Sequence, residues 1–424
     1  MKTWFPPGPG QAVAPSMRFC MVTTFYPPYH FGGDGTYVRA LSEALVNRGH
    51  EVTVVHCEDA YRLSGAEPHV DASHSLVRVH RLHSRFGLLS PLLTQQTGMP
   101  MLKHRALKDI LSEPFDVVNF HNVSLVGGPG VLPMSRARLN LYTLHEHWLV
   151  CATHIFWKNK QRACDKRDCI RCSLKSGIPP QWWRYTPLLT RCTESIDSFI
   201  SPSEYTARQH RAFGIKPPIE VIPLFSYLSP SQFDDQSEGK PHFLTVGRIT
   251  ASKGVGELVS AFSKWPDVAL TVVGDGDLLP ELRQRYQSYP NIQFLGQLPQ
   301  QQLEQLYRQS AALILPSLAP ETFGLTVVEA FACGTPAIVR VAGGNRETID
   351  QSGAGFLYET EARLRTIVET FSQDSTLRAE LGKKARAAYE QYYTEAVHLK
   401  SYLALIERLL EKTVDGESQD DVRV

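Results

Sequence analysis

The sequence lacks several features that mark special classes of protein. It contains no run of about 18 apolar residues, so it predicts no transmembrane helix. The opening "MKTWFPPGPGQAVAPS" has no apolar core of the kind found in secretory signals, and we expect residues 1–16 to form a flexible extension. Eight cysteines in 424 residues are too few for a disulfide scaffold. Together these absences favour a cytoplasmic protein in a reducing compartment.

Neither sign of charge is in excess. The chain has 44 Lys and Arg against 43 Asp and Glu, a formal net charge of +1, so its overall charge predicts no nucleic-acid partner. Hydrophobic residues make up 42% and charged residues 21%, a composition typical of folded globular proteins. At roughly 100–200 residues per domain, this length predicts two domains. Any anion that the protein binds must be held by local groups.

Short apolar runs alternate with amphipathic segments along most of the chain, which is the pattern of parallel sheets covered by helices. In the first half the expected strands are 17–25, 50–57, 115–122, 139–147 and 195–203, with a helix over 36–49. The polar, turn-rich stretch 225–241 predicts a linker, and the alternation restarts at 242. We therefore expect two α/β domains, 17–224 and 242–400, followed by a terminal helix and disordered tail over 401–424.

Parallel sheets bind ligands at the carboxyl ends of their strands, so polar residues that follow strands are the candidates for a site. In "HFGGDG", Gly32 and Gly33 would let a phosphate approach backbone N–H groups where a helix begins. Paired glycines are equally typical of a plain turn. In "VGRITASKG", Arg248 and Lys253 follow a strand and would hold a diphosphate without a metal, unless they are two solvated surface charges.

Two acids bracket the apolar stretch "ETFGLTVVE". If residues 323–333 form a helix, Glu321 lies at its N-terminal entrance and Glu329 about two turns along, a span of about 12 Å at 1.5 Å per residue. That span is too long for the paired carboxyls of a glycosidase, but it suits an extended ligand that has hydroxyls at both ends. The alternative is one acid that favours the helix dipole and one exposed acid.

These motifs, in this order, resemble the E-x7-E region of retaining glycosyltransferases of family 4. The resemblance rests on "ETFGLTVVE", "AFACGTPAI" and "GGNRE", with "VGRITASKG", "VVGDGDLLPEL" and "GGDGTYVRALSEALVNRGHEVTVV" as further matches, and covers most of residues 17–400. It implies the α/β GT-B fold, two Rossmann-like domains that face each other across a ligand crevice. The first domain would bind the acceptor and the second the nucleotide sugar.

The resemblance also implies the reaction and its partners. We expect transfer of a sugar from a nucleotide-diphosphate sugar, UDP- or GDP-linked, to a hydroxyl of a glycan or lipid-linked acceptor, in polysaccharide or glycoconjugate biosynthesis. A lipid-linked acceptor would bring peripheral contact with the inner face of the membrane. Rival interpretations are an epimerase or phosphorylase of the same architecture, or a non-catalytic subunit that binds sugar nucleotides or glycans.

Family roles can be assigned to the donor side position by position. Glu321 would bind hydroxyls of the donor sugar and Glu329 the ribose, while Arg248 and Lys253 would neutralise the leaving diphosphate. The backbone amides expected near that diphosphate belong to Gly32, Gly33, Phe323, Gly324 and Leu325.

On the sugar side, "VVNFHN" places His121 after a strand of the first domain, where the resemblance implies a hydrogen bond to the reacting sugar. His145 and His147 in "LHEHW" are competing candidates. The expected catalytic set is therefore His121, Glu321, Arg248 and Lys253.

No catalytic metal is expected, and the D-x-D of Asp275 and Asp277 is interpreted as a turn. Four cysteines, Cys151, Cys164, Cys169 and Cys172, lie within 22 residues and predict a structural zinc site; a histidine, His145, His147 or His154, is an alternative ligand. Free thiols and a disulfide or redox pair are the other interpretations.

Just beyond the cysteines, three aromatic residues favour either a stacking surface for the acceptor or ordinary packing: Trp182, Trp183 and Tyr185.

Overall fold

The computed structural model describes residues 15–420 apart from 64–75, 167, 227 and 229–241. Of the expected N-terminal extension, 1–16, only the last two residues fall within this description. The expected linker, 225–241, lies almost wholly outside the described residues.

The first half of the chain forms a seven-stranded sheet in the order β3-β2-β1-β4-β5-β8-β9, with every pair parallel. Its strands are β1 (Arg18–Val22), β2 (Glu51–Cys57), β3 (Arg78–Leu82), β4 (Val117–Phe120), β5 (Leu139–Thr143), β8 (Ser198–Ser201) and β9 (Ile219–Val221). The covering helices are α1 (Gly33–Val46), α2 (Glu58–Arg62), α3 (Leu89–Thr97), α4 (His104–Leu111), α6 (Leu188–Thr193) and α7 (Glu204–Ala212). A parallel sheet buried on both faces explains why the inner strands are nearly continuous apolar runs.

The second half forms a six-stranded parallel sheet in the order β12-β11-β10-β13-β14-β15. Its strands are β10 (His242–Val246), β11 (Ala269–Val273), β12 (Ile292–Gly296), β13 (Ala312–Leu315), β14 (Ala337–Arg340) and β15 (Gly355–Tyr358). Its helices are α8 (Val255–Phe262), α9 (Leu279–Tyr286), α10 (Gln300–Gln309), α11 (Leu325–Ala332), α12 (Asn345–Ser352), α13 (Glu361–Gln373) and α14 (Ser375–Ala388).

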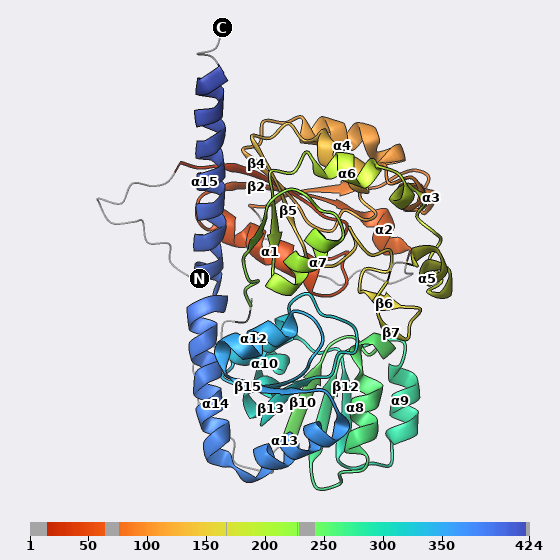
Figure 1. Cartoon of the computed structure of the whole chain (residues 1–424), viewed down its shortest axis with the longest axis vertical. Helices are drawn as coiled ribbons and strands as arrows, with labels where there is room; N and C mark the ends of the chain where they lie inside the picture. The colour runs from red at the N-terminus through yellow and green to blue at the C-terminus, as the bar shows by residue number, and fades with distance from the viewer. Residues whose placement is uncertain (1–14, 64–75, 167, 227, 229–241, 421–424) are drawn as a thin grey trace, which may run out of the picture.

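The two sheets belong to two Rossmann-like lobes, the arrangement of the GT-B fold, so the predicted fold class is confirmed. Figure 1 shows the first sheet and its helices in the upper lobe, coloured red to green, and the second in the lower lobe, coloured green to blue. In each sheet the order steps outward in both directions from β1 or β10. The carboxyl ends of the strands on either side of this switch point are where ligands bind in such folds.

The last helix returns from the second lobe to the first. After a π-helical turn at Tyr389–Tyr393, α15 (Glu395–Asp420) runs along one side of the molecule (Figure 1). The ring of His398 is 2.7 Å from the hydroxyl of Tyr37 on α1, and Asn119 on β4 donates to the hydroxyl of Tyr402 at 3.0 Å. This helix therefore packs into the core of the first lobe.

The predicted disordered tail differs from the structure. Helix α15 continues to Asp420 and so includes most of the polar segment that we expected to be disordered. Extending a helix that is already anchored by packing costs little, because each added residue gains a backbone hydrogen bond without a new nucleation step.

Among the described residues, no helix combines the length and the apolar character needed to cross a membrane.

The cysteine-rich segment forms a small separate element at the edge of the first lobe. It consists of the two-residue strands β6 (Trp157–Lys158) and β7 (Arg162–Ala163), paired antiparallel, and the short helix α5 (Cys169–Lys175). Asn159 and Lys160 at the turn between the strands have positive φ angles of 56° and 60°.

Candidate functional site

The loop after β10 carries the two predicted cations. Arg248 is exposed at the carboxyl end of the strand, and Lys253 ends the 3₁₀ turn Ala251–Lys253. The turn closes at Gly254, which has a φ of 68°, and a Cβ atom there would lie 2.1 Å from the carbonyl oxygen of Pro316. Only glycine permits this contact between the loop and the end of β13. The contact brings Lys253 to the segment that contains Glu321.

Lys253 and Glu321 form an ion pair, with 2.6 Å between Nζ and Oε1. The hydroxyl of Ser317, which follows β13, donates to the same carboxylate oxygen. Burial alone would raise the pKa of Glu321, but the charge and hydrogen bond of Lys253, the hydroxyl of Ser317 and the charge of Arg248 hold it below its usual range. Glu321 is therefore an anion at neutral pH. The structure brings three of the predicted site residues together: Arg248, Lys253 and Glu321.

The backbone around Glu321 corrects the predicted helix over 323–333. Glu321 forms an isolated parallel bridge with Gly343, and helix α11 begins only at Leu325. The estimate of about 12 Å between the two acids assumed a rise of 1.5 Å per residue from Glu321 onward, and that rise does not apply to residues 321–324, which precede the helix. Gly324, directly before the helix, has a φ of 98°, a conformation that favours glycine.

The start of α11 is a candidate anion site. Gly324 caps the helix with no side-chain hydrogen bond, so its first N–H groups are not capped by a side chain within the described residues. The glycine pair of the first lobe lies beside it, since a Cβ atom at Gly33 would be 3.4 Å from the side chain of Leu325. Gly32 caps α1 with a φ of 72°. The structure thus places the predicted glycines of both lobes next to each other.

Glu329 lies inside α11 and is only 4% exposed. Its carboxylate accepts a hydrogen bond of 2.8 Å from the hydroxyl of Tyr307 on α10. Sequence reasoning missed Tyr307, which is 22 positions away and carries no local signal of the contact. The contact holds this carboxylate in a fixed position within the second lobe, and its predicted role with the ribose stays a prediction.

His121 follows β4, at the carboxyl end of the first sheet. Its Nδ1 lies 2.9 Å from Nε2 of His145, while its own Nε2 is buried and has no hydrogen-bond partner among the described residues. Burial, and then the neighbouring His145, lower the pKa of His121 well below its usual value, so the ring is neutral at neutral pH. A buried ring nitrogen without a partner is suited to a ligand hydroxyl.

The two competing histidines have different surroundings. His145 is the ring that pairs with His121, whereas His147 is buried against Phe156 and His210. His145 therefore belongs to the same cluster as His121, and His147 is placed in the packing beneath the cysteine-rich element.

Asp34 is a further acid at this edge that sequence reasoning did not select. It lies in the first turn of α1, and Asn122, the residue after His121, donates to its Oδ2 at 3.2 Å. Burial, and then the charge of Glu146, raise its pKa to about 6. The available signal was its place directly after the glycine pair in "GGDG".

Asp275 closes a turn, as predicted. Its Oδ1 accepts from the N–H of Gly276 at 2.8 Å, and its carbonyl oxygen accepts from Ile249 at 2.8 Å. In the part of the chain that the structure describes, no three His, Cys, Asp or Glu side chains are grouped so that they could hold a metal ion.

The four cysteines of the predicted zinc site, Cys151, Cys164, Cys169 and Cys172, do line one small cavity. As placed, their thiols make other contacts: Cys172 accepts from the N–H of Asn159 at 3.3 Å, and Cys151 lies 3.4 Å from the hydroxyl of Thr153. The cysteines share this cavity, but within the described residues no three of their side chains are grouped so that they could hold a metal ion. Structural zinc therefore stays a prediction.

The three aromatic residues beyond the cysteines separate into two kinds. Trp183 is buried and its Nε1 donates to the carbonyl oxygen of Gln95 at 3.0 Å, which is a packing role. Trp182 and Tyr185 are each 58% exposed. Acceptor stacking stays a prediction for these two only.

Two models of known protein families match this chain, one over each lobe. Residues 31–225 match the family model Glycosyltransferase Family 4, and residues 231–388 match the model Glycosyl transferases group 1. The chain is 31% identical over 413 residues to a D-inositol 3-phosphate glycosyltransferase of Pseudarthrobacter chlorophenolicus, an alignment that spans 89% of this chain and 91% of that protein.

Two solved structures share the fold. A sucrose-phosphate synthase from Thermosynechococcus elongatus superposes with a TM-score of 0.69 at 20% identity, covering 94% of this chain and all of that chain. HepE from Anabaena, solved in complex with UDP and glucose, superposes with a TM-score of 0.63 at 19% identity, covering 95% of this chain and all of that chain.

Proposed function

The chain belongs to glycosyltransferase family 4, whose members transfer sugar from a nucleotide sugar, and we propose that it uses a UDP-linked sugar to glycosylate a hydroxyl of a glycan or lipid-linked acceptor. We propose a UDP-linked rather than a GDP-linked donor because HepE, which shares the fold, was solved with UDP and glucose. A role in polysaccharide or glycoconjugate biosynthesis belongs to this proposal, as does a cytoplasmic location with peripheral contact at the membrane.

The observation that carries the proposal is the cluster of Arg248, Lys253 and Glu321 at the carboxyl end of the second sheet. The leaving group of the reaction is a nucleoside diphosphate, whose negative charge grows as the bond to the sugar breaks. Arg248 and the three N–H donors of Lys253 supply positive charge there, and the N-terminus of α11 adds backbone N–H groups. The diphosphate would therefore be stabilised without a catalytic metal.

The sugar would lie between Glu321 and His121. Glu321 is ionised, so its carboxylate accepts hydrogen bonds from sugar hydroxyls. His121 is neutral, and its buried Nε2 is the available partner for another hydroxyl. A neutral ring is a poor proton donor but a suitable hydrogen-bonding partner for a sugar that carries positive charge in the transition state. Glu329, fixed by Tyr307, would bind the ribose.

The acceptor would approach from the first lobe. Asp34 lies at that edge beside Asn122, and its carboxyl group, with a pKa of about 6, can accept a hydrogen bond from an acceptor hydroxyl near neutral pH. Retention of configuration, implied by the family, needs no enzyme nucleophile when the acceptor attacks from the face that the diphosphate leaves. The departing phosphate oxygen can then take the acceptor's proton.

A two-stage assay tests the proposal. A thermal-shift screen over UDP-, GDP- and ADP-sugars should raise the unfolding temperature with UDP-sugars most. Product analysis with the selected donor should then show a glycosylated acceptor and one UDP released per sugar transferred. An isomerised nucleotide sugar would indicate an epimerase, and sugar phosphate formed from inorganic phosphate would indicate a phosphorylase. Binding without transfer or donor hydrolysis would indicate a non-catalytic subunit.

A further inference from the structure

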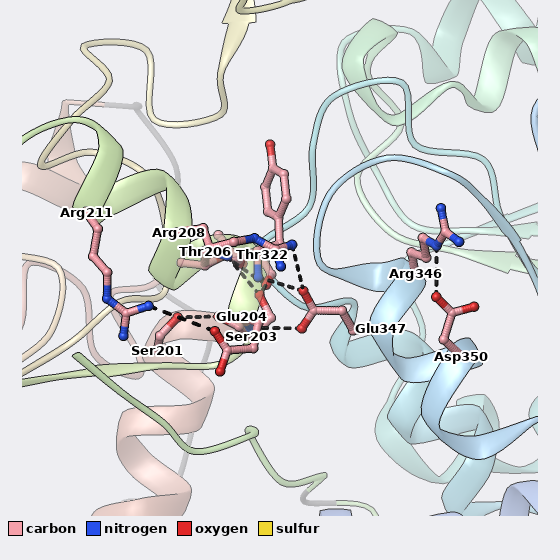
Figure 2. Close-up of polar contacts among 11 residues, drawn as sticks. Ser201, Ser203, Glu204, Thr206, Arg208, Arg211, Thr322, Arg346, Glu347 and Asp350 are labelled. Carbon is pink, nitrogen blue, oxygen red and sulfur yellow. Dashed lines mark hydrogen bonds and ion pairs between the residues drawn. The ribbon is translucent and has the colours of Figure 1, made fainter.

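Two segments of the second lobe that border the candidate site contact one turn of the first lobe. Thr322, the neighbour of Glu321, and Glu347, in the first turn of α12, both meet residues 203–206 at the start of α7. Figure 2 shows α7 on one side of these contacts and α12 on the other. The contacts therefore join the two lobes beside a predicted catalytic residue.

Thr322 makes three hydrogen bonds to the first lobe. Its carbonyl oxygen accepts from the hydroxyls of Ser203 at 2.6 Å and Thr206 at 3.0 Å, and its own hydroxyl donates to the carbonyl oxygen of His145 at 3.0 Å. Ser203 is 3% exposed and Thr206 is fully buried. Because a buried donor without a partner is costly, these hydroxyls favour the position in which Thr322 lies against them.

Glu347 caps α7 from the other lobe. Its two carboxylate oxygens accept from the backbone N–H groups of Glu204 at 2.8 Å and Tyr205 at 2.6 Å. The first N–H groups of a helix have no partner within the helix, and a negative charge there also interacts favourably with the helix dipole. A charge-assisted bond of this kind is stronger than a neutral one.

The contact made by Thr322 and the contact made by Glu347 act as one unit, because backbone hydrogen bonds join the two segments that carry them. Glu321 donates to the carbonyl oxygen of Ala342 at 2.9 Å, and Gly344 donates to the carbonyl oxygen of Glu321 at 2.7 Å. A Cβ atom at Gly344 would lie 2.4 Å from the carbonyl oxygen of Thr322 and 2.5 Å from the hydroxyl oxygen of Ser203. The absence of a side chain at this position is what allows the two lobes to meet.

We propose that Ser203, Thr206 and Glu347 are positioning residues, which fix Glu321 for the donor sugar only while the two lobes are in contact. This inference rests on the proposed function. Arg248 and Lys253, which would hold the diphosphate, lie on a different loop of the second lobe. Binding of UDP should therefore depend much less on the lobe contact than sugar transfer does.

The test compares variants that keep or lose single hydrogen bonds. Thr206→Val keeps the shape and removes the donor, Thr206→Ser keeps the hydroxyl, and Glu347→Ala removes the cap. The matched control is Glu361→Ala, which breaks an exposed ion pair with Lys264 elsewhere in the second lobe. For each variant, kcat for transfer, the Kd for UDP alone and the unfolding temperature are measured.

We expect Thr206→Val and Glu347→Ala to lower kcat by roughly 10- to 100-fold, the effect of a misplaced catalytic group, while the Kd for UDP changes by less than about twofold. Thr206→Ser and Glu361→Ala should behave as the wild type. If Thr206→Val does not fold, the test uses Glu347→Ala and Glu347→Gln instead. Glu347 lies at the partly exposed rim of the contact, so these variants should fold.

Wild-type kcat in Thr206→Val and Glu347→Ala would overturn the inference. So would an equal loss of UDP binding and kcat, because that pattern indicates a merely structural contact. If the wild type itself binds no nucleotide sugar, the proposed function fails first, and the inference fails with it.

Discussion

Nζ of Lys253 lies 2.6 Å from Oε1 of Glu321, although the two residues are 68 positions apart in the chain. The ammonium group has two further N–H donors that a diphosphate can use without breaking this pair. The carboxylate in turn holds the ammonium group of Lys253 in place. The pair thus connects the predicted diphosphate and sugar positions.

Lys253→Ala should leave the fold intact and lower kcat for transfer by roughly 10²- to 10³-fold, because one preorganised charge that faces the leaving group is lost. Steady-state release of nucleoside diphosphate measures this effect. Lys264→Ala is the matched control, since Lys264 forms an exposed ion pair with Glu361 at 2.8 Å, away from the predicted site. Turnover equal to wild type in Lys253→Ala would remove Lys253 from the site.

Glu321→Ala should lower kcat by a comparable factor, and the double variant with Lys253→Ala should be much less impaired than the product of the two single effects. Residues that act as one unit are non-additive in this way. Kinetics of both single variants and the double variant form the cycle. If the loss of kcat in the double variant equals the product of the losses in the two single variants, Lys253 and Glu321 have no joint role.

His121→Ala should weaken binding of the whole nucleotide sugar more than binding of the nucleotide. Loss of one neutral hydrogen bond, about 1 kcal/mol, corresponds to roughly fivefold in Kd for the nucleotide sugar. Calorimetric titration with UDP and with the UDP-sugar compares the two ligands. Equal weakening for both ligands would contradict the placement of this ring at the sugar.

Acid should destabilise the contact between α15 and the first lobe. Burial lowers the pKa of His398 to about 4, against about 6.5 for an unfolded chain. The unfolded chain therefore takes up this proton at a higher pH than the folded protein does. The contribution of the neutral His398 ring to the free energy of unfolding is complete above pH 6.5 and is lost as pH falls toward 4.

Urea unfolding at pH 7.5, 6.0 and 5.0 should show this loss, and His398→Gln should make the fall with pH shallower. Other buried groups add to the wild-type curve, so the informative quantity is the difference between the two proteins. Identical pH dependence in wild type and variant would show that His398 does not contribute.

The cysteine prediction is decided by metal content. If the four cysteines that line the small cavity bind structural zinc, the purified protein should carry roughly one zinc ion per chain, and Cys164→Ser with Cys172→Ser should lower both the zinc content and the unfolding temperature. Elemental analysis after purification in metal-free buffer measures this. Protein without zinc that unfolds at the same temperature would leave the thiol or redox interpretations.

Strands with continuous apolar sequence could be predicted closely: the strand expected over 50–57 is β2, Glu51–Cys57. Edge strand β3, Arg78–Leu82, was not predicted, because two arginines and a histidine interrupt its five residues and leave no apolar run. The start of α11 was misplaced because the segment before it pairs with Gly343, and this long-range bridge leaves no signal in the local sequence.

The places of Arg248 and His121 at the carboxyl ends of strands could be predicted from the sequence, and their roles in a site stay predictions. The contacts that support the candidate site residues could not be predicted. Ser317 and Tyr307 reach the two glutamates only after helices and strands pack, and Asn122 meets Asp34 across 88 positions of sequence. Such partners are ordinary polar residues whose role depends on the fold.

The central claim is that a nucleotide sugar lies across the carboxyl end of the second sheet. A crystal structure of the protein with its UDP-sugar tests this most directly. We predict the diphosphate against Arg248, Lys253 and the start of α11, with the sugar between Glu321 and His121. A nucleotide sugar bound elsewhere, with Lys253 and Glu321 making no contact to it, would contradict the account.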